Sequence, residues 1–84
     1  MDAFSESELM VRATQRIRSG RLPAREPASV WAGHGNGQVC ELCDSPISSK
    51  DLQYEFELEV DGAQRAFRFH IGCARLYQGA TVPD

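Results

Sequence analysis

Three cysteines and one histidine in this chain have the types and the spacing of metal ligands. Cys40 and Cys43 are separated by two residues, as are His70 and Cys73, and the full pattern is C-x2-C-x26-H-x2-C. Each pair can hold two corners of a tetrahedron from one short piece of backbone, which is the geometry that Zn²⁺ prefers with thiolates and imidazoles. The pattern predicts one Zn²⁺ bound by Cys40, Cys43, His70 and Cys73.

Other chemistry could use the same cysteines. A redox-active Cys-x-x-Cys pair is expected at the start of a helix that follows a strand, whereas Cys40 and Cys43 follow a glycine-rich stretch and precede "DSPISS". Three thiolates and an imidazole could also hold an iron–sulfur cluster, although zinc is the commoner occupant of such sites. A disulfide framework would leave one of the three cysteines unpaired. Zinc is the favoured interpretation, and a redox pair or another metal stays open.

The predicted zinc site is closed. Four protein ligands leave no position for a water molecule, so we expect a structural ion and no enzymatic activity. His34, in "GHGNG", is a spare histidine that a complete tetrahedral set does not need. The glycines around it favour a tight loop over a phosphate-binding loop, because neither a preceding strand nor a Gly-Lys-Ser/Thr sequence is evident.

The two ligand pairs must be brought together by the segment between them, "LQYEFELEVDGAQRAFRFH". Apolar residues from Tyr54 to Val60 alternate with glutamates, which is the two-residue period of a strand with one buried face. Asp61-Gly62 supplies a turn, and Phe67 and Phe69 give a second strand its buried side. A β-hairpin is therefore predicted, with its glutamates paired to Arg65 or Arg68 across the strands.

Helices are predicted on either side of this region. After the hairpin, Ala74, Leu76 and Tyr77 give a short helix an apolar face, and Gly79 is its expected end. Because His70 and Cys73 are three residues apart, they would project from the same face of the first turn.

Near the N-terminus, Ser5 and Glu8 have the spacing of a capping box, and Leu9, Ala13 and Ile17 recur every four residues. A helix over about 7–19 follows, with Gly20 as a plausible C-cap. We expect three segments: an N-terminal helix (1–22), a Pro/Gly-rich linker or loop (23–37) and a zinc-binding module (38–84). Trp31 is expected to pack over that module.

Length and charge limit the possible functions. A chain of 84 residues has a small core, so a metal cross-link is expected to stabilise it. No leader sequence and no apolar run of about 20 residues is present, which favours a cytoplasmic protein. The net charge of −3 argues against nucleic-acid binding by the whole surface, but an acid-free basic stretch could contact nucleic acid; it comprises Arg12, Arg16, Arg18, Arg21 and Arg25.

A Cys-x-x-Cys knuckle, a β-hairpin and a helix that carries the last two ligands together resemble the treble-clef class of zinc fingers, over about residues 38–79. Asp44 stands where such knuckles commonly have Gly, and Asp tolerates a left-handed conformation better than most residues. The segments "GRLP", "VWAGHGNGQVCELCDSPI", "YEFELE" and "FRFHIGCARLY" are also similar to a group of small bacterial proteins with a W-x-G-x-G-x-G-x-x-C-x-x-C core and an F-H-x-x-C helix.

These resemblances imply an α+β zinc module and no particular activity, since treble clefs bind DNA, RNA or proteins and a few are nucleases. A protein-protein interaction or regulatory module with an unidentified protein partner is the favoured function. Binding of DNA or RNA is the alternative. A metal-dependent nuclease is less favoured. Such an enzyme needs a histidine on the hairpin as a general base, and the only histidine there, His70, is assigned to zinc.

Overall fold

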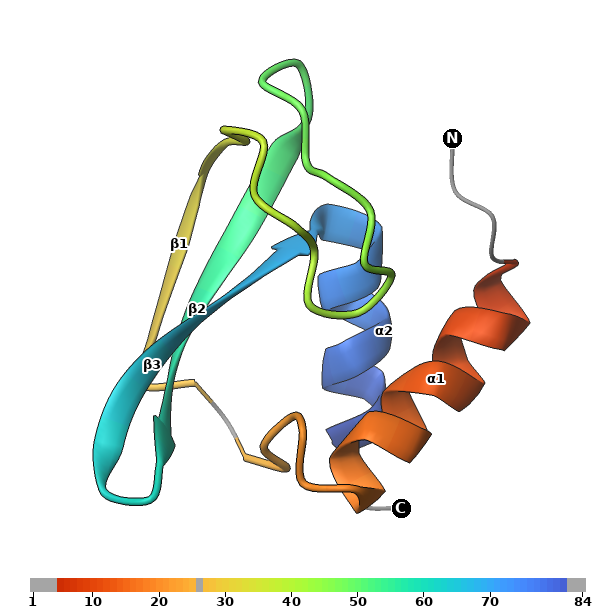
Figure 1. Ribbon diagram of the computed structural model, residues 1–84, viewed down its shortest axis with the longest axis vertical. Coiled ribbons are helices and arrows are strands. Elements are labelled where there is room, and N and C mark those ends of the chain that lie inside the picture. The colour runs from red at the N-terminus through yellow and green to blue at the C-terminus, as the bar shows by residue number, and fades with distance from the viewer. Residues whose placement is uncertain (1–4, 26, 82–84) are drawn as a thin grey trace.

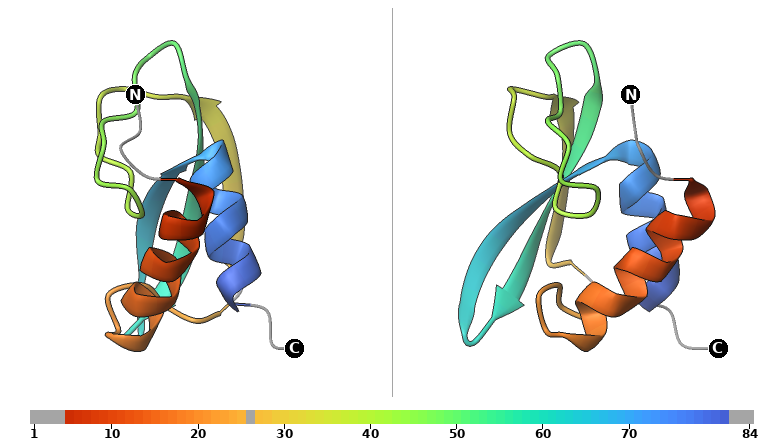
Figure 2. Two further views of the ribbon diagram at one scale, coloured as in Figure 1. Left: turned by 90° about the vertical axis from the view of Figure 1, so that its right-hand side faces the viewer. Right: turned by 45° about the vertical axis from the view of Figure 1, so that its right-hand side comes forward.

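Two helices and a three-stranded antiparallel sheet build the protein. The structure, a computed structural model, describes residues 5–25 and 27–81. Along the chain the elements are α1 (Glu6–Arg18), β1 (Ser29–His34), β2 (Leu52–Val60), β3 (Ala63–His70) and α2 (Ile71–Thr81). The sheet, α2 and α1 follow one another as three layers (Figure 1, Figure 2). The predicted α+β class is confirmed, and the described residues contain no helix long and apolar enough to cross a membrane.

The predicted hairpin is formed by β2 and β3. Asp61 and Gly62 both have positive φ, 53° and 83°, as a two-residue type I′ turn requires, and Val60 pairs with Ala63 on either side of it. The register sets Phe56 opposite Phe67, and both are buried. On the other face Glu55 lies 3.2 Å from the Nε of Arg68, so the glutamate run is partly neutralised by cross-strand pairing as expected.

Helix α2 covers the inner face of this hairpin. Ala74 and Tyr77 are buried, and the ring of Tyr77 stacks on that of Phe69 at 5.0 Å between centroids. Gly79 does not end the helix as the sequence suggested, because α2 continues to Thr81. A glycine in a helix costs only about 1 kcal/mol, and burial of part of Ala80 against the core offsets that cost.

Helix α1 has the predicted capping box and apolar stripe. The amide of Glu8 donates to Ser5 Oγ, and the amide of Ser5 donates to the Glu8 carboxylate. Gly20, with φ 82°, follows the C-cap residue Ser19 and ends the helix. Leu9 and Ala13 are buried in the same core as α2, so α1 docks on the rest of the protein through its predicted stripe.

Part of the segment 23–37, which was predicted to be a linker or loop, forms strand β1. This strand pairs antiparallel with β2, from Ser29 opposite Glu57 to His34 opposite Leu52. Its backbone forms the ladder while both of its faces stay largely exposed, so no buried-face alternation marks it in the sequence. Trp31 does not pack over the module as expected; it is 60% exposed, and its Nε1 donates to the Glu57 carboxylate at 3.1 Å.

The glycine after β1 has no room for a side chain. A Cβ on Gly35 would lie 2.4 Å from the carbonyl oxygen of Ser48 and 2.6 Å from Cγ2 of Ile47, whereas a Cβ on Gly33 would meet nothing within 4 Å. Gly35→Ala is therefore expected to lower the free energy of unfolding by about 2 kcal/mol. Gly33→Ala, the matched control, should change it by less than about 0.5 kcal/mol. Thermal unfolding of the metal-loaded variants measures the difference, and equal stability of the two would contradict the packing described.

Candidate metal centre

The first two ligands lie in a tight turn between β1 and β2. The amide of Asp44 donates to the carbonyl of Cys40 at 3.0 Å, and the amide of Cys40 donates to the carbonyl of Ser45 at 2.9 Å. Asp44 has φ 64°, which is the left-handed conformation that the knuckle was expected to need at this position. This turn, the knuckle (residues 40–45), aims both cysteine side chains into the protein, and both are buried.

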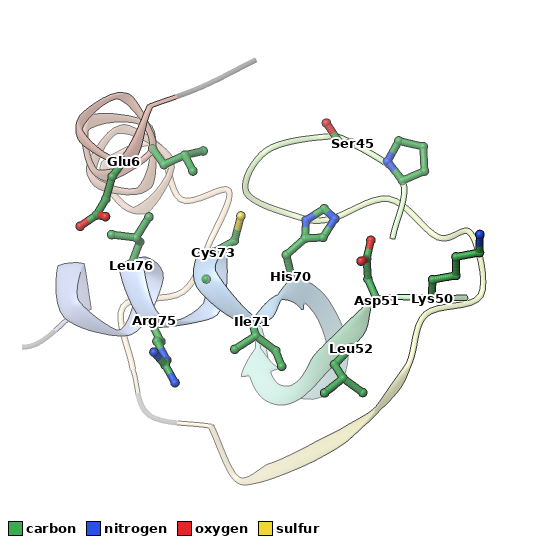
Figure 3. A pocket seen from close by; sticks show the side chains of 13 residues that line it. Glu6, Ser45, Lys50, Asp51, Leu52, His70, Ile71, Cys73, Arg75 and Leu76 are labelled. Carbon is green, nitrogen blue, oxygen red and sulfur yellow. The ribbon is translucent and has the colours of Figure 1, made fainter. Parts of the chain in front are cut away.

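The other two ligands lie where the hairpin passes into α2. His70 is the last residue of β3, and Cys73 is in the first turn of α2. The amide of Glu41 donates to the carbonyl of Arg68 at 2.8 Å, which fixes the knuckle to the end of β3. Figure 3 shows the side chains of His70 and Cys73 pointing from the start of α2 toward the loop that carries Ser45.

The structure brings all four predicted ligands together. The ligand atoms of Cys40, Cys43, His70 and Cys73 lie within 4.8 Å of one another. The sulfur of Cys43 is 3.4 Å from Nδ1 of His70. Tetrahedral zinc, with Zn–S of about 2.3 Å and Zn–N of about 2.1 Å, places such a pair about 3.6 Å apart. The donor set and its spacing therefore fit one tetrahedral ion of the zinc type, with Nδ1 as the histidine ligand.

Hydrogen bonds around Cys40 stabilise a thiolate. The pKa of Cys40 is lowered to about 4, first because its sulfur accepts a hydrogen bond from Cys73, and further by backbone amides, among them that of Leu42. The pKa of Cys73 is raised, because its thiol donates to Cys40 and is buried beside that charge, and burial also raises the pKa of Cys43. The hydrogen bonds within the cluster therefore favour the thiolate form of Cys40 over those of Cys43 and Cys73.

Metal binding should release protons. A bound divalent ion needs thiolates at Cys43 and Cys73, so about two protons leave the folded cluster, or about three when an unfolded chain with ordinary thiols folds on binding. Apparent affinity should therefore rise about 100- to 1000-fold per pH unit near neutrality. Competition with a chromophoric chelator at several pH values measures this slope. An affinity that did not change with pH would show that the thiols are not the ligands.

An open cleft of about 1060 Å³ lies beside the cluster, lined by His70 and Cys73 among others (Figure 3). Glu6 of α1, Lys50 before β2 and Arg75 of α2 also border it. Two of the four ligands thus border the cleft, although Cys73 itself is buried. Since cations and carboxylates both line it, its charge favours no single class of small ligand.

The spare histidine is not part of the cluster. His34 ends β1, is exposed and pairs with Leu52 in the ladder. His34 does not belong to the group of four ligand residues. Among residues 5–25 and 27–81, that group is the only one placed to hold a metal ion.

Two of the arginines considered for nucleic-acid contact, Arg12 and Arg16, bind the knuckle. Nε of Arg12 donates to the carbonyl of Leu42 at 2.6 Å, and Arg16 donates to the carbonyl of Glu41. Both also pair with the carboxylate of Asp44; Nη2 of Arg16 lies 2.7 Å from its Oδ2. Hydrogen bonding by Arg16 lowers the pKa of Asp44. Arg16 itself is only 8% exposed, so α1 is fixed to the knuckle by buried charge as well as by apolar packing.

The remaining arginines of that stretch are exposed. Arg21 is 3.8 Å from Asp44, and Arg25 is 3.5 Å from Glu59. Arg18 is exposed at the end of α1. Sequence reasoning noted that Arg12 and Arg16 share one helical face but did not foresee Asp44 as their partner. The unusual Asp at the left-handed position of the knuckle was the one signal that could have indicated it.

The fold and the cluster define a small α+β protein with a Cys₃His site compatible with zinc binding. Comparisons of the chain with protein families, curated proteins and solved structures found no match.

Proposed function

We propose that the protein binds one structural Zn²⁺ through Cys40, Cys43, His70 and Cys73. The observation that carries the proposal is the approach of these four ligand atoms to within 4.8 Å of one another, from two segments distant in sequence. The ion has a structural and not a catalytic role, because four protein ligands leave no position for water. The order of knuckle, hairpin and helix supports assignment to the treble-clef class.

Cobalt substitution tests this site directly. Co²⁺ takes the same tetrahedral ligands and, unlike Zn²⁺, absorbs visible light. One equivalent should give intense bands of tetrahedral cobalt together with thiolate-to-metal charge transfer, and Zn²⁺ should displace it. The weak spectrum of octahedral cobalt, without charge-transfer bands, would exclude a cysteine-rich tetrahedral site.

We propose that the fold stabilised by this ion presents a surface of the sheet to another protein. In support, apolar side chains remain exposed on the sheet, among them Val30 at 50% and Trp31 at 60%. The two side chains lie on opposite faces of β1, and apolar side chains left exposed at the edge of a sheet are available to a protein partner. The N-terminal arginines support nucleic-acid binding less well, since Arg12 and Arg16 are already held by the knuckle.

Titration of labelled DNA and RNA separates the two candidate functions. A protein-interaction module should give no change in fluorescence anisotropy at low salt. Binding that weakens steeply with added salt, and that is reduced by Arg18→Ala or Arg21→Ala, would instead favour the nucleic-acid function.

A further inference from the structure

Strand β1 has one open edge and two uncovered faces. In the sheet order β1-β2-β3 it pairs only with β2, and it contacts no other helix or strand among the described residues. Helix α2 packs on β2 and β3, so the inner face of β1 stays uncovered. Five of its six residues are exposed. Figure 1 shows β1 beside β2, with no helix packed against it.

The direction of the peptide groups defines the open edge. The amide of Gly35 donates to the carbonyl of Asp51 at 2.9 Å, in register with the β1–β2 ladder. Because residues alternate along an antiparallel ladder, the peptide groups of Trp31 and Gly33 also point toward β2. Those of Val30, Ala32 and His34 then point outward, where they can pair with another strand.

The open edge lacks the usual protection against pairing. Native edges carry lysine, proline or an inward charge to prevent it. Within Ser29–His34 there is no proline and no acidic residue, lysine or arginine. Two copies of this strand can therefore approach without opposing like charges.

We propose that two copies of the protein associate by antiparallel pairing of β1 with β1, about a two-fold axis at Trp31. In this register the outward peptide groups of Val30 face those of Ala32 in the second copy. By symmetry, those of Ala32 face Val30 of the second copy. This register agrees with the alternation of an antiparallel ladder, because Trp31 lies opposite Trp31 of the second copy at a non-hydrogen-bonded position. The result is a continuous six-stranded sheet, and the interaction surface of the proposed function is then a self-association surface.

Side-chain complementarity selects this register. The inner face brings Val30 beside Ala32 of the second copy, a large residue beside a small one. The outer face gathers the two Trp31 side chains near the axis, and each donates a hydrogen bond to Glu57 of its own copy. Shifting the axis to Ala32 would place Val30 opposite His34, and shifting it to Val30 would place Trp31 opposite Ser29. Both alternatives lose apolar contact.

Sedimentation of the zinc-loaded protein tests the pairing. The chain of 9.3 kDa should approach twice that mass as concentration rises from about 1 to 500 µM, since one strand pair makes a small interface of modest affinity. Val30→Lys should keep the protein monomeric throughout. Val11→Lys is the matched control: Val11 is 58% exposed, lies on α1, and its replacement should leave the dimer intact.

Any result other than these expected ones would overturn the proposed dimer. A zinc-loaded wild-type protein that stays monomeric up to the highest concentration would exclude the dimer while leaving the metal site unaffected. A dimer that survives Val30→Lys but not Val11→Lys would place the interface on α1. Zinc content and the cobalt spectrum of each variant confirm that it is folded, so failure of the metal site is distinguishable from failure of the dimer.

Discussion

Cys43→Ser is expected to leave residues 38–79 largely unfolded even with zinc present. A structural zinc site contributes on the order of 10 kcal/mol of binding free energy, and the loss of one thiolate forfeits much of it. The core alone cannot compensate, because Cys40 and Leu42 of the knuckle belong to the same buried cluster as Phe56. The dispersion of hairpin amide signals in NMR spectra measures the effect.

Histidine offers a matched control for this prediction. His70→Ala should unfold the module as Cys43→Ser does, since Nδ1 of His70 lies 3.4 Å from the Cys43 sulfur. His34→Ala removes the other histidine of the chain, which is exposed and outside the cluster, and should retain both zinc and fold. Native-like spectra for His70→Ala, or loss of zinc in His34→Ala, would mean that the ligand set is wrong.

Arg16→Met is expected to lower the stability of the zinc-loaded protein by about 3 kcal/mol. Methionine keeps an apolar stem in the interface but removes every donor of a side chain that is only 8% exposed. The carbonyl of Glu41 and both carboxylate oxygens of Asp44 lose that partner. The cost lies at the lower end for a broken buried pair, because the Asp44 side chain remains 43% exposed and water can hydrate it.

Arg18→Met is the control, since Arg18 is exposed two residues further along α1. It should change stability by less than about 0.5 kcal/mol. Hydrogen exchange should show faster exchange of the α1 amides in Arg16→Met while the hairpin remains protected. Equal behaviour of the two variants would show that the contacts of Arg16 with the knuckle do not hold α1 in place.

The metal centre and the docking of α1 are physically linked. The knuckle directs its sulfurs toward the candidate ion and the carbonyls of Glu41 and Leu42 toward Arg16 and Arg12. An ordered knuckle therefore presents acceptors that a disordered one could not present together. Loss of the ion is expected to release α1 as well as the hairpin.

Local patterns predicted the parts of the fold that rest on periodicity or ligand spacing. Alternation from Tyr54 to Val60 and the Asp61-Gly62 turn were enough for the hairpin, and the cysteine and histidine spacing was enough for the four clustered ligands. The capping box at Ser5 and Glu8 located the start of α1. The information lies in short local patterns, and for the ligands in two pairs whose members are each three residues apart.

The parts that sequence missed depend on contacts between distant residues. Strand β1 is held by backbone pairing to β2 and buries neither face, so its side chains carry no period. The exposure of Trp31 follows from that position at the margin of the sheet. The ion pairs of Arg12 and Arg16 with Asp44 join residues about 30 positions apart, and no local rule relates them.

Native mass spectrometry with and without a chelator tests the central claim most directly. The protein should carry the mass of one zinc ion per chain, and chelation should remove that mass and collapse the dispersed NMR signals of residues 52–70. An unchanged mass together with unchanged hairpin shifts after chelation would contradict the claim that a zinc ion holds this fold together.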